Sequence, residues 1–190
     1  MIMVSKHFDN MIVERNDAMT TGPFEIERKF LINLEQTPAA FAAMLHYYCE
    51  KTLKVSTISQ TYLIAEEGER RVRKRTTDGK TEFFYTEKFT ISGIKRIENE
   101  REITEDEYTE YLSEADSKLK TIEKTRYTFQ FDGQTIEIDI YAFSTDKAIL
   151  EIELPSEDTA VSLPHFIHVI REVTADKAYK NKSLAKTQSL

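Results

Sequence analysis

Cysteine, glycine and proline are scarce in this chain of 190 residues, and tryptophan is absent. The single cysteine, Cys49, excludes an internal disulfide framework and is typical of proteins kept in a reducing compartment, so we expect a cytoplasmic location. Five glycines leave little room for a glycine-rich loop that binds phosphate through backbone N–H groups. If the protein binds phosphate, its side chains must therefore do so.

Long apolar runs and an excess of positive charge are missing as well. The longest apolar runs contain only a few residues, too few to span a bilayer, so we expect no membrane partner. The chain has 33 Asp and Glu residues against 26 Lys and Arg, a formal net charge of −7. Non-specific nucleic-acid binding depends on excess positive charge, so no nucleic-acid partner is expected.

The chain is predicted to form one domain that follows an N-terminal extension. Residues 1–23 lack the continuous apolar segment of a secretory signal and contain acidic residues, which argue against a transit peptide. We therefore expect residues 1–23 to be a flexible extension and residues 24–190 to be the ordered domain. Hydrophobic residues make up 40% of the chain, enough for a core.

Charged and apolar residues alternate along much of the chain, at the period of two that indicates β-strands with two different faces. The segments with this pattern are 24–33, 69–77, 95–103, 122–131, 135–143 and 148–154, with further strands expected near 56–65 and 80–89. Asp-Gly pairs at 78–79 and 132–133 predict tight hairpins between strands. About eight mostly antiparallel strands can close into a barrel.

Four segments favour helices, which makes the predicted fold class α+β. Residues 38–50 carry apolar side chains at helical spacing, and Thr104 with Glu107 forms a capping box that opens a helix to about residue 117. Pro164 suits the first turn of a helix over 164–171, and the segment from residue 178 is also expected to be helical.

Several strands gather charges of one sign on one face. Arg71, Arg73 and Arg75 share a face of one strand, and Glu98 and Glu100 share a face of another. Neighbouring side chains on one face lie about 7 Å apart, so the like charges within each row repel one another. Two interpretations remain open at this point. Either the sheet is solvated and salt-bridged, or acidic rows hold divalent cations while basic rows hold a polyanion such as polyphosphate.

Residues 25–29, Glu-Ile-Glu-Arg-Lys, resemble the ExExK signature of the CYTH domain family, also called the triphosphate tunnel metalloenzyme superfamily. Later motifs occur in the family's order, at residues 60–63, 71–73, 88, 96–100, 124–127, 138–141, 151–154 and 172–185. The resemblance covers residues 24–186. It implies an eight-stranded antiparallel closed β-barrel, a tunnel with a charged interior and helices packed outside.

The resemblance also implies divalent-metal-dependent hydrolysis of inorganic tripolyphosphate or another triphosphate, with Mg²⁺ or Mn²⁺ as the cofactor. The carboxylates expected to form the metal-binding wall are Glu25, Glu27, Glu98, Glu100, Asp139, Glu151 and Glu153. The cationic residues expected to bind phosphate oxygens are Arg71, Arg73, Lys88, Arg96, Lys124 and Arg126. Lys29 is expected to orient or activate the attacking water, together with Tyr62.

Two other functions remain open from the sequence. A class IV adenylyl cyclase would convert ATP to cyclic AMP and pyrophosphate with the same metals and cations. A non-catalytic polyphosphate- or nucleotide-binding module would bind without turnover, although the complete acidic set argues against a degenerate site. The expected partner is a small-molecule triphosphate in each case, and a homodimer is left open.

Overall fold

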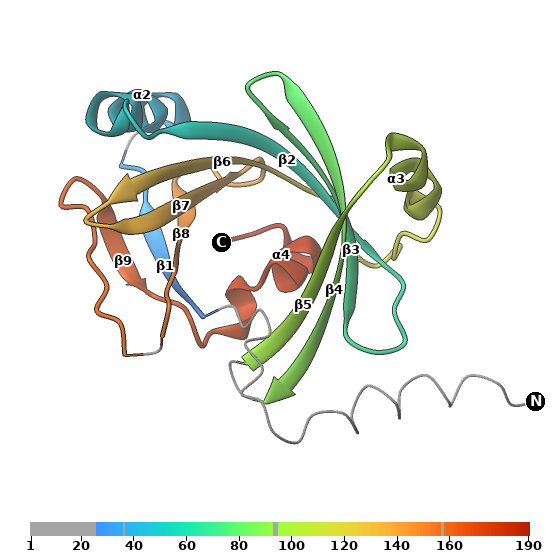
Figure 1. Cartoon of the computed structure of the whole chain (residues 1–190). Helices are drawn as coiled ribbons and strands as arrows, with labels where there is room; N and C mark the ends of the chain where they lie inside the picture. Colours follow the sequence, from blue (N-terminus) through green and yellow to red (C-terminus); the bar gives the residue numbers. More distant parts are fainter. Residues whose placement is uncertain (1–25, 36, 93–94, 157) are drawn as a thin grey trace, which may run out of the picture.

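One antiparallel sheet of nine strands dominates the computed structural model, which describes residues 26–35, 37–92, 95–156 and 158–190 (Figure 1). The strands are β1 (Glu27–Asn33), β2 (Lys54–Leu63), β3 (Glu69–Thr77), β4 (Lys80–Ser92), β5 (Lys95–Ile103), β6 (Ile122–Phe131), β7 (Gln134–Tyr141), β8 (Lys147–Glu153) and β9 (His168–Glu172). Their order in the sheet is β5-β4-β3-β2-β6-β7-β8-β1-β9. The predicted extension at residues 1–23 lies outside the described residues.

Three α-helices accompany the sheet within the described residues, which confirms the α+β class. They are α2 (Pro38–Cys49), α3 (Glu105–Leu112) and α4 (Asn181–Thr187), and a 3₁₀ turn, Lys177–Tyr179, precedes α4. In the described part of the chain, no helix is both long enough and apolar enough to cross a bilayer. The predicted capping box is confirmed, because Thr104 and Glu107 bond each other's backbone N–H groups at the start of α3.

The eight predicted strands are all present, and three of them have the predicted bounds. Both predicted hairpins are confirmed, because Asp78, Gly79, Asp132 and Gly133 all have positive φ angles, as a type I′ turn requires. Asp-Gly supplies this conformation with little strain, and it matches the right-handed twist of the flanking strands.

The sheet curls around α4, while α2 and α3 lie on its outer side (Figure 1). Neighbouring strands are hydrogen-bonded from β5 to β9, but no backbone pairing joins these two edge strands within the described residues. The closed eight-stranded barrel is therefore not confirmed. The structure shows a curled, open sheet with a concave inner face.

Two helix predictions need correction. The predicted helix over residues 164–171 is wrong, because its second half is β9, which pairs with β1 from Asn33 to Phe30. The free edge of β1 offers backbone partners that local propensity does not reveal. The helix predicted to reach residue 117 ends at Leu112, because the chain turns back and Ala115 forms a bridge with Leu63 of β2.

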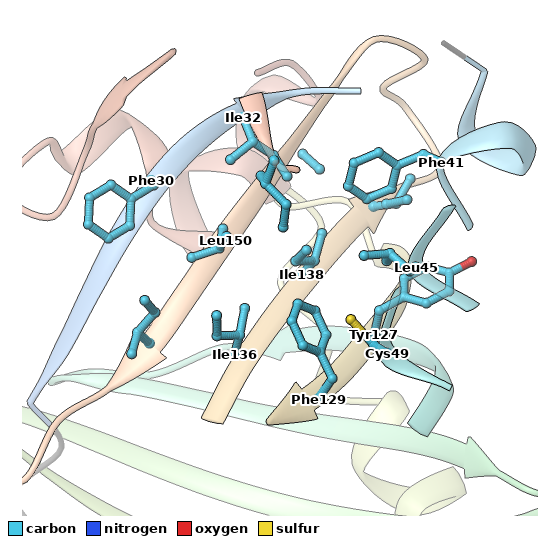
Figure 2. Packing of buried hydrophobic residues seen from close by; sticks show 14 of the residues in the cluster. Phe30, Ile32, Phe41, Leu45, Cys49, Tyr127, Phe129, Ile136, Ile138 and Leu150 are labelled. Carbon is cyan, nitrogen blue, oxygen red and sulfur yellow. The ribbon is translucent and has the colours of Figure 1, made fainter. Parts of the chain in front are cut away.

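The convex face of the sheet carries the main apolar core. Ile136, Ile138, Leu150 and Ile152 are completely buried and pack with the apolar side of α2. Figure 2 shows the α2 side chains approaching this face beside Ile138, Tyr127 and Phe129. The apolar half of each alternating strand is thus removed from water, and this leaves the charged half for the concave face.

The concave face is apolar only at one end. Residues from five strands form a second core there with side chains of α4, namely Leu31, Tyr62, Ile122, Tyr141, Ile149, Leu184 and Ala185. The hydroxyl of Tyr141 donates a hydrogen bond of 2.7 Å to Asn181 at the start of α4. The C-terminal helix therefore forms an apolar floor beneath the rest of the inner face.

Replacing Ile138 with Ala should reduce the free energy of unfolding by about 2–5 kcal/mol, because it leaves a cavity between α2 and the sheet. Chemical denaturation measures the change. The matched control is Ile64→Ala, whose side chain is 63% exposed and should change stability by less than about 0.5 kcal/mol. Equal effects of the two substitutions would contradict the assignment of this core.

Candidate active site

A cavity of about 470 Å³ lies on the concave face of the sheet. Its lining is almost entirely polar or charged and consists of Glu27, Lys29, Gln60, Tyr62, Glu69, Arg71, Arg73, Arg75, Lys88, Glu98, Glu100, Lys124, Arg126, Glu137, Glu151, Glu153, Lys180, Asn181 and Lys182. Strands β1 to β8 all contribute, because every second residue of each strand points inward. The same-sign rows therefore converge on one cavity on the concave face of the sheet.

The acidic side of the cavity is built by β1, β7 and β8. Strand register places Glu27 directly opposite Glu153, and Glu137 directly opposite Glu151. Lys29 lies within this group, with its Nζ 2.5 Å from Glu151 Oε1 and 3.2 Å from Glu27 Oε1. One ammonium group thus separates two carboxylates that would otherwise repel each other.

A buried ionic network joins this acidic side to β6. The Arg126 guanidinium donates two hydrogen bonds of 2.7 Å to Asp139 and one of 3.0 Å to Glu151, and it also contacts Glu137. Lys124 bonds the same Asp139 carboxylate. Asp139 is completely buried beneath the cavity lining. It therefore acts on the site by holding Lys124 and Arg126 in place.

Protonation states follow from this pairing. Burial disfavours the charge on Lys29, but the carboxylates of Glu151 and Glu27 outweigh it and raise the pKa of Lys29. Burial likewise opposes ionisation of Glu151, yet Lys29 and Arg126 together hold the pKa of Glu151 well below its usual value. Burial raises the pKa of Tyr62. Lys29 as an ammonium ion and Tyr62 as a phenol are suited to orienting a water molecule and not to removing its proton.

The basic side of the cavity is built by β3 and β4, with carboxylates from β5 behind it. Arg71 bonds Glu98 at 2.9 Å, and Arg73 bonds both oxygens of Glu100 at 2.9 Å. Lys88 forms an ion pair with Glu98. These contacts hold the cationic groups in fixed positions along the wall.

The arginines on this wall have hydrogen-bonding capacity to spare. Within the part of the chain that the structure describes, the buried Nε groups of Arg71, Arg73 and Arg75 have no hydrogen-bond partner. Burial and the positive charge of Arg71 lower the pKa of Arg73 to about 10. An anion in the cavity would accept hydrogen bonds from these N–H groups and would reduce the repulsion between the guanidinium groups.

On the acidic side of the cavity, negative charge is in excess. Burial raises the pKa of Glu137, and the negative charges of Asp139, Glu151 and Glu153 raise it further, although Arg126 opposes them. Glu137 lies on the same strand face as Asp139, but sequence reasoning missed it as a site residue. Its position two residues before Asp139, within a row of carboxylates, was the available signal.

The structure brings most predicted site residues together around the cavity. The predicted residues among the lining are Lys29, Tyr62, Arg71, Arg73, Lys88, Lys124, Arg126, Glu27, Glu98, Glu100, Glu151 and Glu153. Asp139 lies behind the lining. Glu25 and the side chain of Arg96 lie outside the described residues. Sequence reasoning placed Arg75 in a basic row but not among the residues expected to bind phosphate. It gave no role to Lys180 and Lys182, which the fold of the C-terminal segment brings to the cavity.

The donor chemistry of the acidic side suits a divalent metal ion. Carboxylate oxygens are the hard ligands that Mg²⁺ and Mn²⁺ prefer, and Glu27 and Glu153 face each other on adjacent strands. Burial raises the pKa of Glu137 and the neighbouring carboxylates raise it further, and a cation would relieve this repulsion. Among the described side chains, no three His, Cys, Asp or Glu are gathered closely enough to form a ready-made metal site.

The buried carboxylates predict a loss of stability in acid. The pKa values of Glu151 and Asp139 are lower in the folded chain than in the unfolded chain, so their stabilisation is present above the unfolded values and disappears as they become protonated. The free energy of unfolding should fall as the pH is lowered below about 5. Denaturation at a series of pH values measures the slope, and Glu151→Gln should show a shallower slope than the parent. An unchanged slope would contradict the assigned ion pairing.

Comparison with known proteins agrees with this geometry. Two relatives named inorganic triphosphatase are similar over 163 residues, which is 85% of this chain. The protein from Acetivibrio thermocellus is 34% identical with 93% of its length covered, and that from Nitrosomonas europaea is 35% identical with 96% covered. The crystal structure of the inorganic triphosphatase NE1496 superposes with a TM-score of 0.55 at 30% identity, covering 90% of this chain and 98% of that one.

The family model described as the CYTH domain matches residues 23–185. This range includes every strand of the sheet and every residue that lines the cavity. The protein is therefore a member of the CYTH domain family.

Proposed function

We propose that this protein is a divalent-metal-dependent triphosphatase that hydrolyses inorganic tripolyphosphate and releases phosphate. The observation that carries the proposal is the cavity itself, in which under-satisfied arginines face a cluster of mutually repelling carboxylates. A complex of a polyanion and a divalent cation satisfies both sides at once. The similarity to proteins named inorganic triphosphatase supports the same reaction.

The cationic wall would bind the substrate. Arg71 and Arg73 offer forked N–H groups to phosphate oxygens, whereas Lys88 acts as a point charge. Arg126 belongs to β6, which lies between this wall and the acidic side in the sheet. It lines the cavity and also bonds Asp139. Phosphoryl transfer depends mainly on positioning and on stabilising negative charge, and a fixed row of cations supplies both.

The acidic side would hold the metal ion. Glu27 and Glu153 are the proposed ligands, joined by Glu25 of the same signature and assisted by Glu137 and Glu151. When bound, Mg²⁺ or Mn²⁺ neutralises charge on the phosphate oxygens and makes a neighbouring water more acidic. Glu98 and Glu100 hold arginines in this structure, so we assign them a positioning role.

Lys29 and Tyr62 would orient the reacting groups. The Lys29 ammonium lies between Glu27 and Glu151, and its backbone N–H donates a 3.0 Å hydrogen bond to Thr174. Tyr62 accepts a hydrogen bond of 3.1 Å from Gln60. The ion pairs of Lys29 and the hydrogen bond to Tyr62 would hold these side chains in place while water and substrate exchange, which is what an in-line attack requires.

The proposal includes the tunnel and the single domain. Residues 24–190 would form this single domain. Its curled sheet, with α4 across one end, would enclose the phosphate chain. Enclosure excludes bulk water and strengthens each charge interaction in the cavity.

Replacing Glu153 with Gln should lower the rate of phosphate release from tripolyphosphate with Mg²⁺ by more than about 100-fold, because it removes a charge that binds the metal. Circular dichroism should show a folded protein. The control is Glu102→Gln, an exposed glutamate on β5 outside the cavity lining, which should keep the parental rate. Parental activity in Glu153→Gln would refute the metal assignment.

The same assay separates the alternative functions. ATP with Mg²⁺ or Mn²⁺ should give no cyclic AMP, whereas an adenylyl cyclase would form cyclic AMP and pyrophosphate. A non-catalytic binding module would bind tripolyphosphate and release no phosphate with either metal.

Replacing Arg73 with Gln should lower kcat/KM for tripolyphosphate by roughly 10- to 100-fold, since it removes a charged hydrogen-bond donor to the substrate. Steady-state kinetics measures the change. Lys74→Gln is the matched control, because this exposed neighbour on β3 lies outside the cavity lining and should have parental kinetics. Similar losses in both variants would indicate a general charge effect and not a specific contact.

A further inference from the structure

A third arginine on β3 extends the cationic wall toward the open end of the cavity. Arg71, Arg73 and Arg75 share one strand face and span about 13 Å. Arg71 is paired across the sheet with Tyr62, which belongs to the apolar floor against α4. Arg75 is therefore the member of the row that is farthest from the floor. Its side chain is 36% exposed, compared with 11% for Arg71 and 13% for Arg73.

The ion pairs of Arg75 differ from those of the deeper arginines. Arg71 and Arg73 are paired with Glu98 and Glu100 of β5, whereas Arg75 bonds Glu82 of β4 at 2.9 Å. Arg75 therefore belongs to a separate ion-pair group that is centred on Glu82.

Glu82 is shared between two cations. Its other oxygen accepts a hydrogen bond of 2.7 Å from Lys80, so Arg75, Lys80 and Glu82 carry a net charge of +1. The buried Nε of Arg75 has no hydrogen-bond partner in the described part of the chain. Arg75 therefore retains a hydrogen-bond donor for an anion.

Phe84 aligns this group with the deeper arginines. The Arg75 guanidinium lies 4.7 Å from the centroid of the Phe84 ring, and the Arg73 guanidinium lies 5.2 Å from it. Both cations are thus held over one aromatic ring and form a continuous row. The same contacts occupy the ring, which disfavours its use as a stacking platform for a nucleobase.

We propose that Arg75 is an additional phosphate-binding position at the open end of the cavity, so that a linear tetraphosphate binds more tightly than tripolyphosphate. This rests on the proposed function, in which Arg71, Arg73 and the deeper cations bind three phosphates. Arg75 binds the fourth phosphate of the chain without any covalent bond. It is thus a determinant of substrate length and takes part in no bond-breaking step.

Titration calorimetry without divalent metal tests this proposal, because the ligands then bind without depending on turnover. The parent should bind inorganic tetraphosphate about tenfold more tightly than tripolyphosphate, as one charged hydrogen-bond donor would give. In Arg75→Gln the ratio of the two dissociation constants should fall to about one. Lys74→Gln, altered beside Arg75 and outside the cavity lining, should keep the parental ratio.

Three outcomes would overturn the proposal. Equal weakening of both ligands in Arg75→Gln would show that Arg75 contributes only a general positive field. Parental dissociation constants for both ligands in that variant would show that Arg75 makes no contact with a fourth phosphate. If Arg75→Gln instead abolished a preference for ATP over tripolyphosphate, the position would serve a nucleoside. Failure of the proposed hydrolysis would be seen separately, as no phosphate release by the parent with metal.

Discussion

The structure depends on the separation of apolar and charged side chains onto opposite faces of one curled sheet. The convex face packs with α2 and supplies the main apolar core, and the concave face holds the charged cavity. Buried ion pairs contribute little net stability, because removing charges from water costs about as much as the pairing returns. The convex face and the floor therefore stabilise a concave face that is arranged for binding.

Charge compensation inside the cavity is incomplete on both walls. Glu98 and Glu100 hold the arginines but leave Nε groups unsatisfied, while Lys29 and Arg126 hold Glu151 yet leave Glu137 with a raised pKa. This arrangement keeps the side chains in place before any ligand arrives, so little conformational entropy is lost on binding. A ligand that combines phosphate with a divalent cation would accept hydrogen bonds from the unsatisfied arginine N–H groups on one wall and neutralise the carboxylates on the other.

Much of the architecture could be predicted because its signals are local. Strand alternation and the Asp-Gly turns depend on residues close together in the chain, and six of the eight expected strands were identified from their alternation. The features that sequence reasoning missed depend on distant partners. β9 forms because the edge of β1 is free, and α3 stops where Ala115 meets Leu63. The cavity residues that were missed include Lys182, whose Nζ approaches the backbone of Gly68, 114 positions away.

The sequence alone determined which residue types share a strand face, since the backbone sends alternate side chains to opposite sides. It also carried the motif order that indicates the family. Only the tertiary structure decided that the charged rows face each other across one cavity, because this depends on how the strands and helices from distant parts of the chain pack together. The same packing decided that Asp139 supports the site from behind and that α4 forms its floor. These are properties of contacts between distant segments, which no pattern within a single strand contains.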